Sequence, residues 1–244
     1  MKVLGIIPSR FASTRFPGKP LIDINGKTMI QRVYEQAKKA KSLSEVIVAT
    51  DDNKIFEHIN SFGGNVVMTA SSHESGTERC AEVLGKIEGK FDVVINIQGD
   101  EPFIDPEQIN QLTACFDDKI TDIATLIKKI ETKEELFNPN RPKVDVDGNS
   151  FAIMFSRNAI PELVGVEKSA WLAQQSFYKH IGIYGYRADV LKTISKLSPS
   201  PLEIEERLEQ LRWLENGYKI KTAITTHEAI AIDEPSDLEK LNTH

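Results

Sequence analysis

Short apolar runs alternate with helical patterns through the first half of the chain. Four of these runs end in turn-forming, small or polar residues, at positions 3–7, 46–49, 66–68 and 93–97. Between them, apolar residues recur every three or four positions, which is typical of helices with one buried face. Thr28 and Gln31 form a capping-box signature at the start of one such pattern. Repeated β-α units with short connections predict an α/β fold with a mostly parallel, doubly wound sheet of the Rossmann-like type.

The pattern changes after about residue 120. Apolar residues alternate on both sides of an Asp-Gly-Asn turn at 147–149, which predicts a β-hairpin. Residues 180–186 alternate again. We therefore expect one domain over residues 1–244 with a β-rich excursion at about 140–187, of the kind that serves as a lid or a subunit contact.

Composition narrows the class of protein. The net charge of −6 argues against nucleic acid as a partner, which would require a broad basic face. Cys80 and Cys115 lack the spacing of a metal site or a disulfide framework, so we expect free thiols in a reducing cytoplasm. No apolar run is long enough to span a membrane. The sequence therefore predicts a cytoplasmic protein.

A cationic loop at residues 9–20 directly follows the first apolar run and contains Arg10, Arg15 and Lys19. Open α/β sheets bind ligands just beyond the carboxyl ends of their strands. Backbone N–H groups, hydroxyls and cations at that point suit a triphosphate. The alternative is a solvated basic loop, but two prolines and a glycine fix a backbone path that such a loop does not need. We therefore interpret the loop as an anion site.

Two Asp-Glu-Pro triplets, beginning at Asp100 and Asp233, each follow an apolar strand. If the strands are parallel, both carboxylates lie on the same sheet edge as the cationic loop and would repel a triphosphate. Mg²⁺ resolves this conflict, because it binds one or two carboxylates together with phosphate oxygens. Either aspartate alone is better explained as a helix cap or a turn residue. Together, and opposite the loop, they predict a magnesium site.

Two further segments can contact a nucleotide. Ser75 and Gly76 open a predicted helix that continues through Arg79, so their N–H groups can face a base or ribose, although capping explains Ser75 almost as well. Gln98 precedes Asp100 and carries an amide that both donates and accepts hydrogen bonds, which suits a site or a plain loop equally.

The second half of the chain holds candidate sugar-binding residues. Strand alternation places His180, Tyr184 and Tyr186 on one face, and the intervening glycines leave room for a ligand. That composition suits a polyhydroxylated ligand, with half-buried core tyrosines as the alternative. Arg157 follows another predicted strand and can form a forked pair with a carboxylate or a simple surface ion pair.

Taken together, these stretches resemble the 3-deoxy-manno-octulosonate cytidylyltransferases, the CMP-Kdo synthetases. The resemblance runs nearly end to end and in the right order. Its motifs are Ile7–Pro20, Ala49–Asp51, Ser75–Arg79, Gln98–Pro102, Phe155–Arg157, His180–Arg187 and Leu208–Arg212.

The resemblance implies transfer of CMP from CTP to the anomeric 2-hydroxyl of 3-deoxy-D-manno-octulosonate (Kdo), with release of pyrophosphate. By motif, Arg10 and Lys19 are implied to be catalytic, and Asp100 and Asp233 to be catalytic ligands of Mg²⁺. The implied nucleotide contacts are Pro8, Ser9, Arg10, Arg15, Lys19, Ser75, Gly76, Arg79 and Gln98. The implied sugar pocket consists of Gln98, Arg157, His180, Tyr184, Glu209 and Gln210.

The resemblance further implies a homodimer joined through the excursion, and a place in lipopolysaccharide assembly in a Gram-negative bacterium. Three positions depart from the family pattern. Ser9 stands where alanine is common, Glu234 replaces a small hydroxyl residue, and Pro142 interrupts an expected strand.

Two rival functions stay open at this stage. One keeps the chemistry and changes the acceptor to 8-amino-Kdo or sialic acid. The other is a non-catalytic nucleotide-binding protein, against which the retention of Asp100 and Asp233 argues. A dinucleotide-dependent dehydrogenase and a P-loop kinase are disfavoured, because neither glycine-rich fingerprint follows the first strand.

Overall fold

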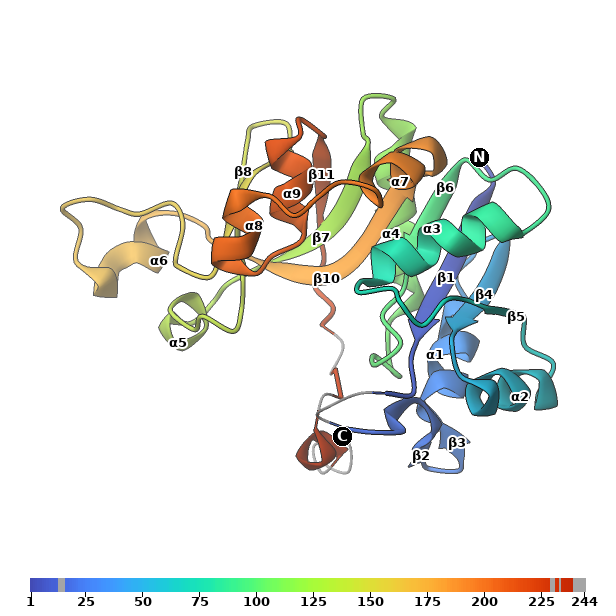
Figure 1. Cartoon of the computed structure of the whole chain (residues 1–244). Coiled ribbons are helices and arrows are strands. Elements are labelled where there is room, and N and C mark those ends of the chain that lie inside the picture. Colours follow the sequence, from blue (N-terminus) through green and yellow to red (C-terminus); the bar gives the residue numbers. More distant parts are fainter. Residues whose placement is uncertain (13–15, 229–230, 233, 239–244) are drawn as a thin grey trace.

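A single mixed sheet organises the chain in a computed structural model that describes residues 1–12, 16–228, 231–232 and 234–238 (Figure 1). Its parallel half consists of β1 (Val3–Ser9), β4 (Glu45–Thr50), β5 (Val66–Met68) and β6 (Val93–Asn96). These strands lie in the order β5-β4-β1-β6. Gly5 of the central strand pairs with Val46 on one side and Ile95 on the other. The predicted parallel, doubly wound sheet is confirmed.

The main path of the sheet continues through β7 (Ile123–Lys129), β10 (Tyr178–Arg187) and β11 (Ile220–Ile224), and two further strands join it through β10. β10 runs antiparallel between β6 and β7, and β11 pairs in parallel with β7. The last strand of the expected excursion is thus part of the main sheet. β10 is antiparallel because the chain, after the excursion, enters the sheet at the end where the neighbouring strands finish.

Helices cover both faces of the sheet. They are α1 (Met29–Ala37), α2 (Asn53–Ser61), α3 (Gly76–Lys86), α4 (Pro106–Ala114), α7 (Ala188–Ile194), α8 (Pro201–Glu206) and α9 (Gln210–Glu215). Along β1, Val3 and Ile7 belong to the core that α1, α2 and α4 cover, whereas Leu4 and Ile6 belong to the core that α3, α7 and α9 cover. This is the alternation of a strand buried on both faces.

Local signals account for the helix starts. The Thr28 side chain accepts a hydrogen bond from the Gln31 N–H at the start of α1, as the capping-box signature predicts. Asp105 and Gln108 form a reciprocal capping box at the start of α4. Such caps typically stabilise a helix by about 1 kcal/mol, because they satisfy N–H groups that have no partner within the helix.

The excursion carries the predicted hairpin and a small core of its own. β8 (Lys143–Val146) and β9 (Ala152–Ser156) pair antiparallel, and the Asp147 carboxylate closes the turn by accepting the N–H groups of Asn149 and Phe151. Figure 1 shows the following yellow segment reaching away from the sheet. There, α5 (Lys133–Leu136) and α6 (Trp171–Gln174) help to bury Trp171 against Phe177, with their rings stacked.

The remaining elements are short. They are β2 (Asp23–Ile24), β3 (Lys27–Thr28) and the 3₁₀ turns at Lys19–Leu21, Cys115–Asp117 and Lys168–Ala170. In the described part of the chain, we find no helix with the length and apolar character that crossing a bilayer requires.

Candidate active site

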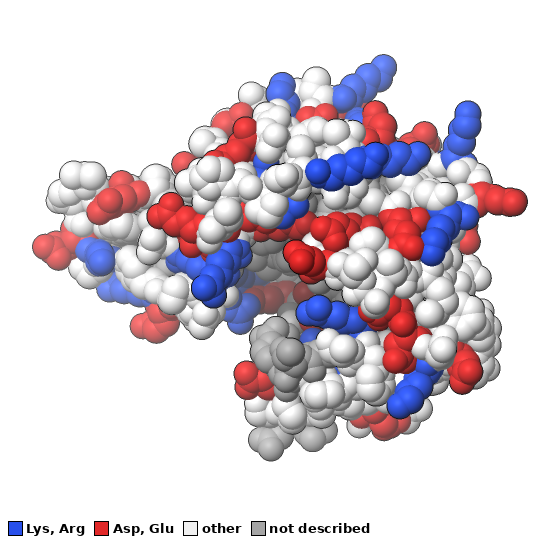
Figure 2. All heavy atoms as spheres, viewed as in Figure 1, with Lys and Arg blue, Asp and Glu red and all other residues white. Residues whose placement is uncertain are grey.

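A cavity of about 260 Å³ opens where the parallel strands β1 and β6 end. Figure 2 shows the molecule hollowed near its centre on this face, with acidic and basic side chains around the hollow. The residues that line the cavity are Pro8, Ser9, Arg10, Lys19, Pro20, His73, Glu74, Ser75, Gly76, Arg79, Gln98, Gly99 and Asp100. The structure therefore has a cavity at the sheet edge where the sequence predicts a ligand site.

Tight backbone packing shapes the cavity wall. A Cβ on Gly99 would lie 2.7 Å from the Pro8 carbonyl oxygen, so only glycine lets these two strand ends approach each other. A Cβ on Gly76 would lie 3.1 Å from the Asn96 amide nitrogen. Small residues thus bring backbone groups of three separate segments to one wall.

The cationic loop meets a carboxylate on the wall of this cavity. Lys19 Nζ lies 2.9 Å from Asp100 Oδ2, although the two residues are far apart in sequence. Both side chains are partly buried, with exposed fractions of 13% and 29%. Gly18, in the left-handed region at φ 73°, donates its N–H to the Phe11 carbonyl oxygen and so closes the loop. The predicted meeting of cation and carboxylate is confirmed for this pair.

Two of the predicted site residues, Arg15 and Asp233, lie outside the described residues. The neighbouring Ile232 donates its N–H to the Asp100 carbonyl oxygen at 2.9 Å, so the two segments with Asp-Glu-Pro triplets meet. Glu101 is half-buried at the same place, and burial, together with the charges of Asp100 and Glu228, raises its pKa to about 8. This carboxyl group therefore avoids adding a second full negative charge beside Asp100 at neutral pH.

The described residues fit a Mg²⁺ ion that takes some of its ligands from the substrate. Across the described ranges, no cluster of three or more His, Cys, Asp or Glu residues is placed to hold a metal. Mg²⁺ does not need such a cage, since it usually binds through one or two carboxylates, waters and substrate phosphates. Asp100 supplies a partly exposed carboxylate on the cavity wall.

The start of α3 forms the opposite wall. The Ser75 side chain caps the helix by accepting the Glu78 N–H at 3.2 Å, so the capping interpretation of this residue is confirmed. Arg79 lines the cavity, but its guanidinium is buried and donates to the carboxylate of Asp51 and the hydroxyl of Thr69. Any contribution of Arg79 to nucleotide binding is therefore a contribution to the shape and charge of the wall.

Gln98 links the cavity to β10. Its amide nitrogen donates to the Gly182 carbonyl oxygen at 2.7 Å, within a bulge of β10 between Ile181 and Tyr184. The Thr125 hydroxyl fastens the same bulge through the carbonyl oxygens of Ile181 and Ile183. Gln98 thus lies between the nucleotide-side cavity and the strand that carries the predicted sugar residues.

The predicted sugar residues are partly brought together. The His180 and Tyr184 rings lie 5.1 Å apart, and His180 Nε2 lies 3.0 Å from the Thr125 hydroxyl. Burial lowers the pKa of His180 to about 4, so its ring is neutral at physiological pH. Glu209 accepts a hydrogen bond from Thr77 of α3 at 3.1 Å, and burial raises the pKa of this carboxyl.

Buried polar atoms lack partners in this region. Among the described residues, neither the Tyr184 hydroxyl nor the Gln210 amide nitrogen has a hydrogen-bond partner. An unsatisfied buried polar group costs about 1–3 kcal/mol, so such groups usually have a ligand or water to bind. Burial also raises the pKa of Tyr184 well above its ordinary value, which keeps the hydroxyl protonated.

Arg157 lies apart from the cavity. Its guanidinium donates to the carbonyl oxygens of Glu206, Pro139 and Arg207, at 2.7, 3.2 and 3.3 Å. It lines a separate hollow of about 620 Å³ beside Trp171. The structure therefore does not bring Arg157 to the residues around Lys19, and its role in sugar binding stays a prediction.

His73 and Glu74 line the cavity although the sequence did not indicate them. They precede the cap Ser75 in a loop without hydrophobic periodicity, so no pattern marked them. Their position follows from the packing of this loop against α3.

Comparisons with known proteins agree with this geometry. A cytidylyltransferase family model matches residues 4–220. A 3-deoxy-manno-octulosonate cytidylyltransferase of Parabacteroides distasonis is 57% identical over 98% of this chain and 96% of its own. The enzyme of the same name from Geobacter metallireducens is 44% identical over 99% and 96% of the two chains.

One solved structure supports the family assignment, and a more distant one shares the fold alone. The structure of CMP:2-keto-3-deoxy-manno-octonic acid synthetase complexed with CTP superposes with a TM-score of 0.92 and 41% identity, covering 100% of this chain and 98% of the other. A 4-diphosphocytidyl-2C-methyl-D-erythritol synthase from Anaerococcus prevotii shares the fold, with a TM-score of 0.63 and 12% identity over 99% and 97% of the two chains.

Proposed function

Because the chain belongs to the 3-deoxy-manno-octulosonate cytidylyltransferase family, we propose that it transfers CMP from CTP to the anomeric 2-hydroxyl of Kdo. Pyrophosphate leaves, and the CMP-Kdo formed is the activated sugar for lipopolysaccharide synthesis. The observation that carries this proposal is the meeting of Lys19 with Asp100 on one cavity wall at the carboxyl ends of parallel strands.

The cations of the loop bind the triphosphate and stabilise its leaving part. Arg10 and Lys19 line the cavity, where positive charge lowers the energy of the pyrophosphate as it departs. Arg15 is proposed as a helper on the basis of the motif alone. Pro8, Ser9, Ser75 and Gly76 contribute the wall along which the nucleotide lies.

Mg²⁺ would be held by Asp100 and Asp233 together with the phosphates of CTP. When bound, the ion neutralises phosphate charge and makes the sugar hydroxyl more acidic. The chain itself supplies position: transfer of this kind needs little covalent help once nucleophile and leaving group are aligned. Lys19 also pairs with the Asp100 carboxylate and so helps to orient it.

The sugar is proposed to bind next to Gln98, against His180, Tyr184, Glu209 and Gln210. Support comes from the buried Tyr184 hydroxyl and Gln210 amide, which have no partner among the described residues. A polyhydroxylated acid can satisfy such groups, whereas an apolar ligand cannot. Glu209 connects this side to α3 through Thr77, one residue beyond Gly76.

We further propose that the enzyme is a cytoplasmic homodimer. The two cysteines are buried free thiols, as a reducing compartment allows. Ile153 and Val164 of the excursion expose 57% and 87% of their surface, and a subunit contact would cover such apolar side chains.

An acceptor panel tests the function. Purified protein is incubated with CTP and Mg²⁺, and pyrophosphate release is measured with Kdo, 8-amino-Kdo and sialic acid. We expect the fastest release with Kdo and none after chelation of Mg²⁺. A preference for either rival acceptor would overturn the substrate assignment. CTP binding without pyrophosphate release with any acceptor would favour a non-catalytic nucleotide-binding protein.

A further inference from the structure

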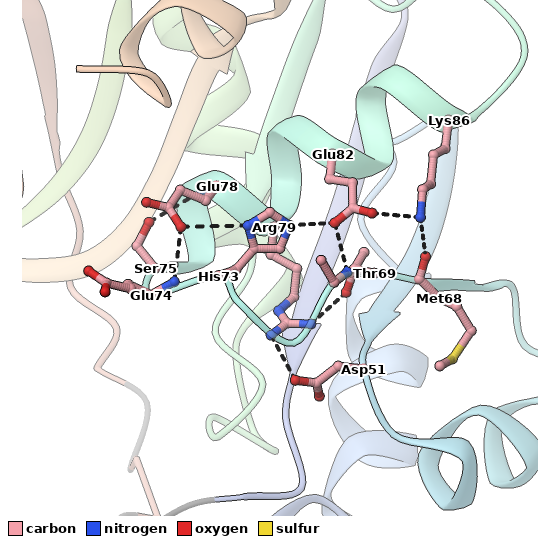
Figure 3. A network of polar contacts seen from close by, with 11 residues as sticks. Asp51, Met68, Thr69, His73, Glu74, Ser75, Glu78, Arg79, Glu82 and Lys86 are labelled. Atoms are coloured by element: carbon pink, nitrogen blue, oxygen red, sulfur yellow. Dashed lines mark hydrogen bonds and ion pairs between the residues drawn. The ribbon is translucent and has the colours of Figure 1, made fainter. Parts of the chain in front are cut away.

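His73 lies in the loop at residues 69–75, which connects β5 to α3 and forms part of the cavity wall (Figure 3). Its side chain is only 19% exposed. The two residues that follow, Glu74 and Ser75, also line the cavity. The conformation of this loop therefore decides the shape of the wall on the α3 side.

Two carboxylates of α3 hold the ends of the loop. Glu82 Oε2 accepts the Ala70 N–H at 2.9 Å, and Glu78 Oε2 accepts the Glu74 N–H at 2.9 Å. Glu78 and Glu82 are one helical turn apart, so they project from the same face of α3 (Figure 3). Each carboxylate thus replaces a backbone partner that the loop itself does not offer.

The His73 ring lies between these carboxylates. Its Nε2 contacts Glu82 Oε2, and its Nδ1 lies 3.5 Å from Glu78 Oε2. Like charges one turn apart on a helix repel each other. The ring lies between the two carboxylates, and its contact with Glu82 ties the loop to the helix. Lys86 extends the network, since its ammonium contacts Glu82 and donates to the Met68 carbonyl oxygen.

We propose that His73 is a positioning residue for the nucleotide: by bridging Glu78 and Glu82 it fixes the loop at 69–75 against α3 in the form that binds CTP. This inference rests on the proposed function and adds a residue to it. A loop fixed before binding loses less conformational entropy when the ligand arrives, so its effect falls on nucleotide affinity. The proposed sugar residues lie on β10 and at positions 209–210, and His73 makes its ring contacts with Glu78 and Glu82 instead.

His73→Asn tests the proposal in steady-state kinetics and in direct CTP titration by calorimetry. We expect the KM and Kd for CTP to rise about five-fold or more, because the contacts of one partly buried ring with two carboxylates are lost, while kcat and the KM for Kdo change less than about two-fold. Glu82→Gln should raise the KM for CTP similarly. The double variant should be no worse than the poorer single variant, since both changes break one bridge.

His58→Asn is the matched control. His58 is half-buried on α2, bonds the Thr28 hydroxyl at 2.7 Å and lies away from the cavity lining. We expect a change in thermal stability without a change in either KM. Equal rises in both KM values for His73→Asn, or strictly additive effects with Glu82→Gln, would overturn the proposal. If the unmodified protein failed to bind CTP in calorimetry, the proposed function itself would fail, which is a separate outcome.

Discussion

Cations serve different purposes in the cavity and in the excursion. In the excursion, Lys143 is fully buried and its ammonium donates to the carbonyl oxygens of Asn138, Arg141 and Arg157. At the cavity, Lys19 faces a carboxylate at the edge of an open hollow. A buried cation among neutral carbonyls holds the backbone together, whereas a cation paired with a carboxylate beside solvent can exchange that partner for phosphate.

Lys179 is a second buried cation that stabilises the fold. Its ammonium is buried on β10 and contacts the carboxylates of Glu135 and Glu228. Lys128 and Arg141 also pair with Glu228, and the nearby cations lower the pKa of this carboxyl. The cluster joins α5, β7 and β10, so in this half of the molecule charge serves the fold.

Asp100→Asn gives the largest expected effect and tests the functional side. Loss of an anionic metal ligand that also pairs with Lys19 should lower turnover by a factor on the order of 100 or more. The circular dichroism spectrum and melting temperature should change little, because the side chain is partly exposed. Asp189→Asn, at an exposed position of α7, is the control and should keep full turnover. Near-normal turnover of Asp100→Asn would refute its assigned role.

Lys143→Met tests the structural side. The change leaves three partly buried carbonyl oxygens without their donor, so the free energy of unfolding should fall by about 3 kcal/mol. Urea unfolding measures this, with Lys129→Met on the exposed end of β7 as the control, for which we expect a change within about 0.5 kcal/mol. An unchanged unfolding midpoint for Lys143→Met would remove the distinction between the two regions.

His180 gives the smallest expected effect, which is a dependence of the free energy of unfolding on pH. Burial lowers its pKa to about 4, whereas an unfolded histidine titrates near about 6.5. Between these values the unfolded chain binds more protons, so the free energy of unfolding falls as pH drops from about 6.5 to about 4.

We expect His180 to account for about 2 kcal/mol of that loss. His180→Gln should remove this part of the slope in urea unfolding measured across the window. His58, whose pKa is also lowered by burial, is the matched control: His58→Gln should remove a smaller part. A slope that His180→Gln leaves unchanged would contradict the buried, neutral state of this ring.

Local patterns predicted much of the fold. Apolar runs and helical periodicity indicated the parallel strands and covering helices, and Thr28 and Gln31 marked a helix start, because these signals depend on neighbours within a few residues. The same reasoning placed Lys19 and Asp100 on one sheet edge, since both follow strands of a parallel sheet. The same reasoning did not predict that β10 is antiparallel to β6, because the direction of a strand depends on the path by which the chain returns to the sheet.

The sequence by itself thus determined the class of fold, and it placed the cationic loop and the Asp100 carboxylate on the same sheet edge. Only the tertiary structure decided which polar groups are engaged: that Arg157 donates to backbone carbonyls, that Gln98 holds the bulge of β10, and that His73 lies between two carboxylates. The physical reason is that each of these contacts needs a backbone path or a neighbour set by packing, and packing brings together segments whose spacing in the chain carries no periodic signal.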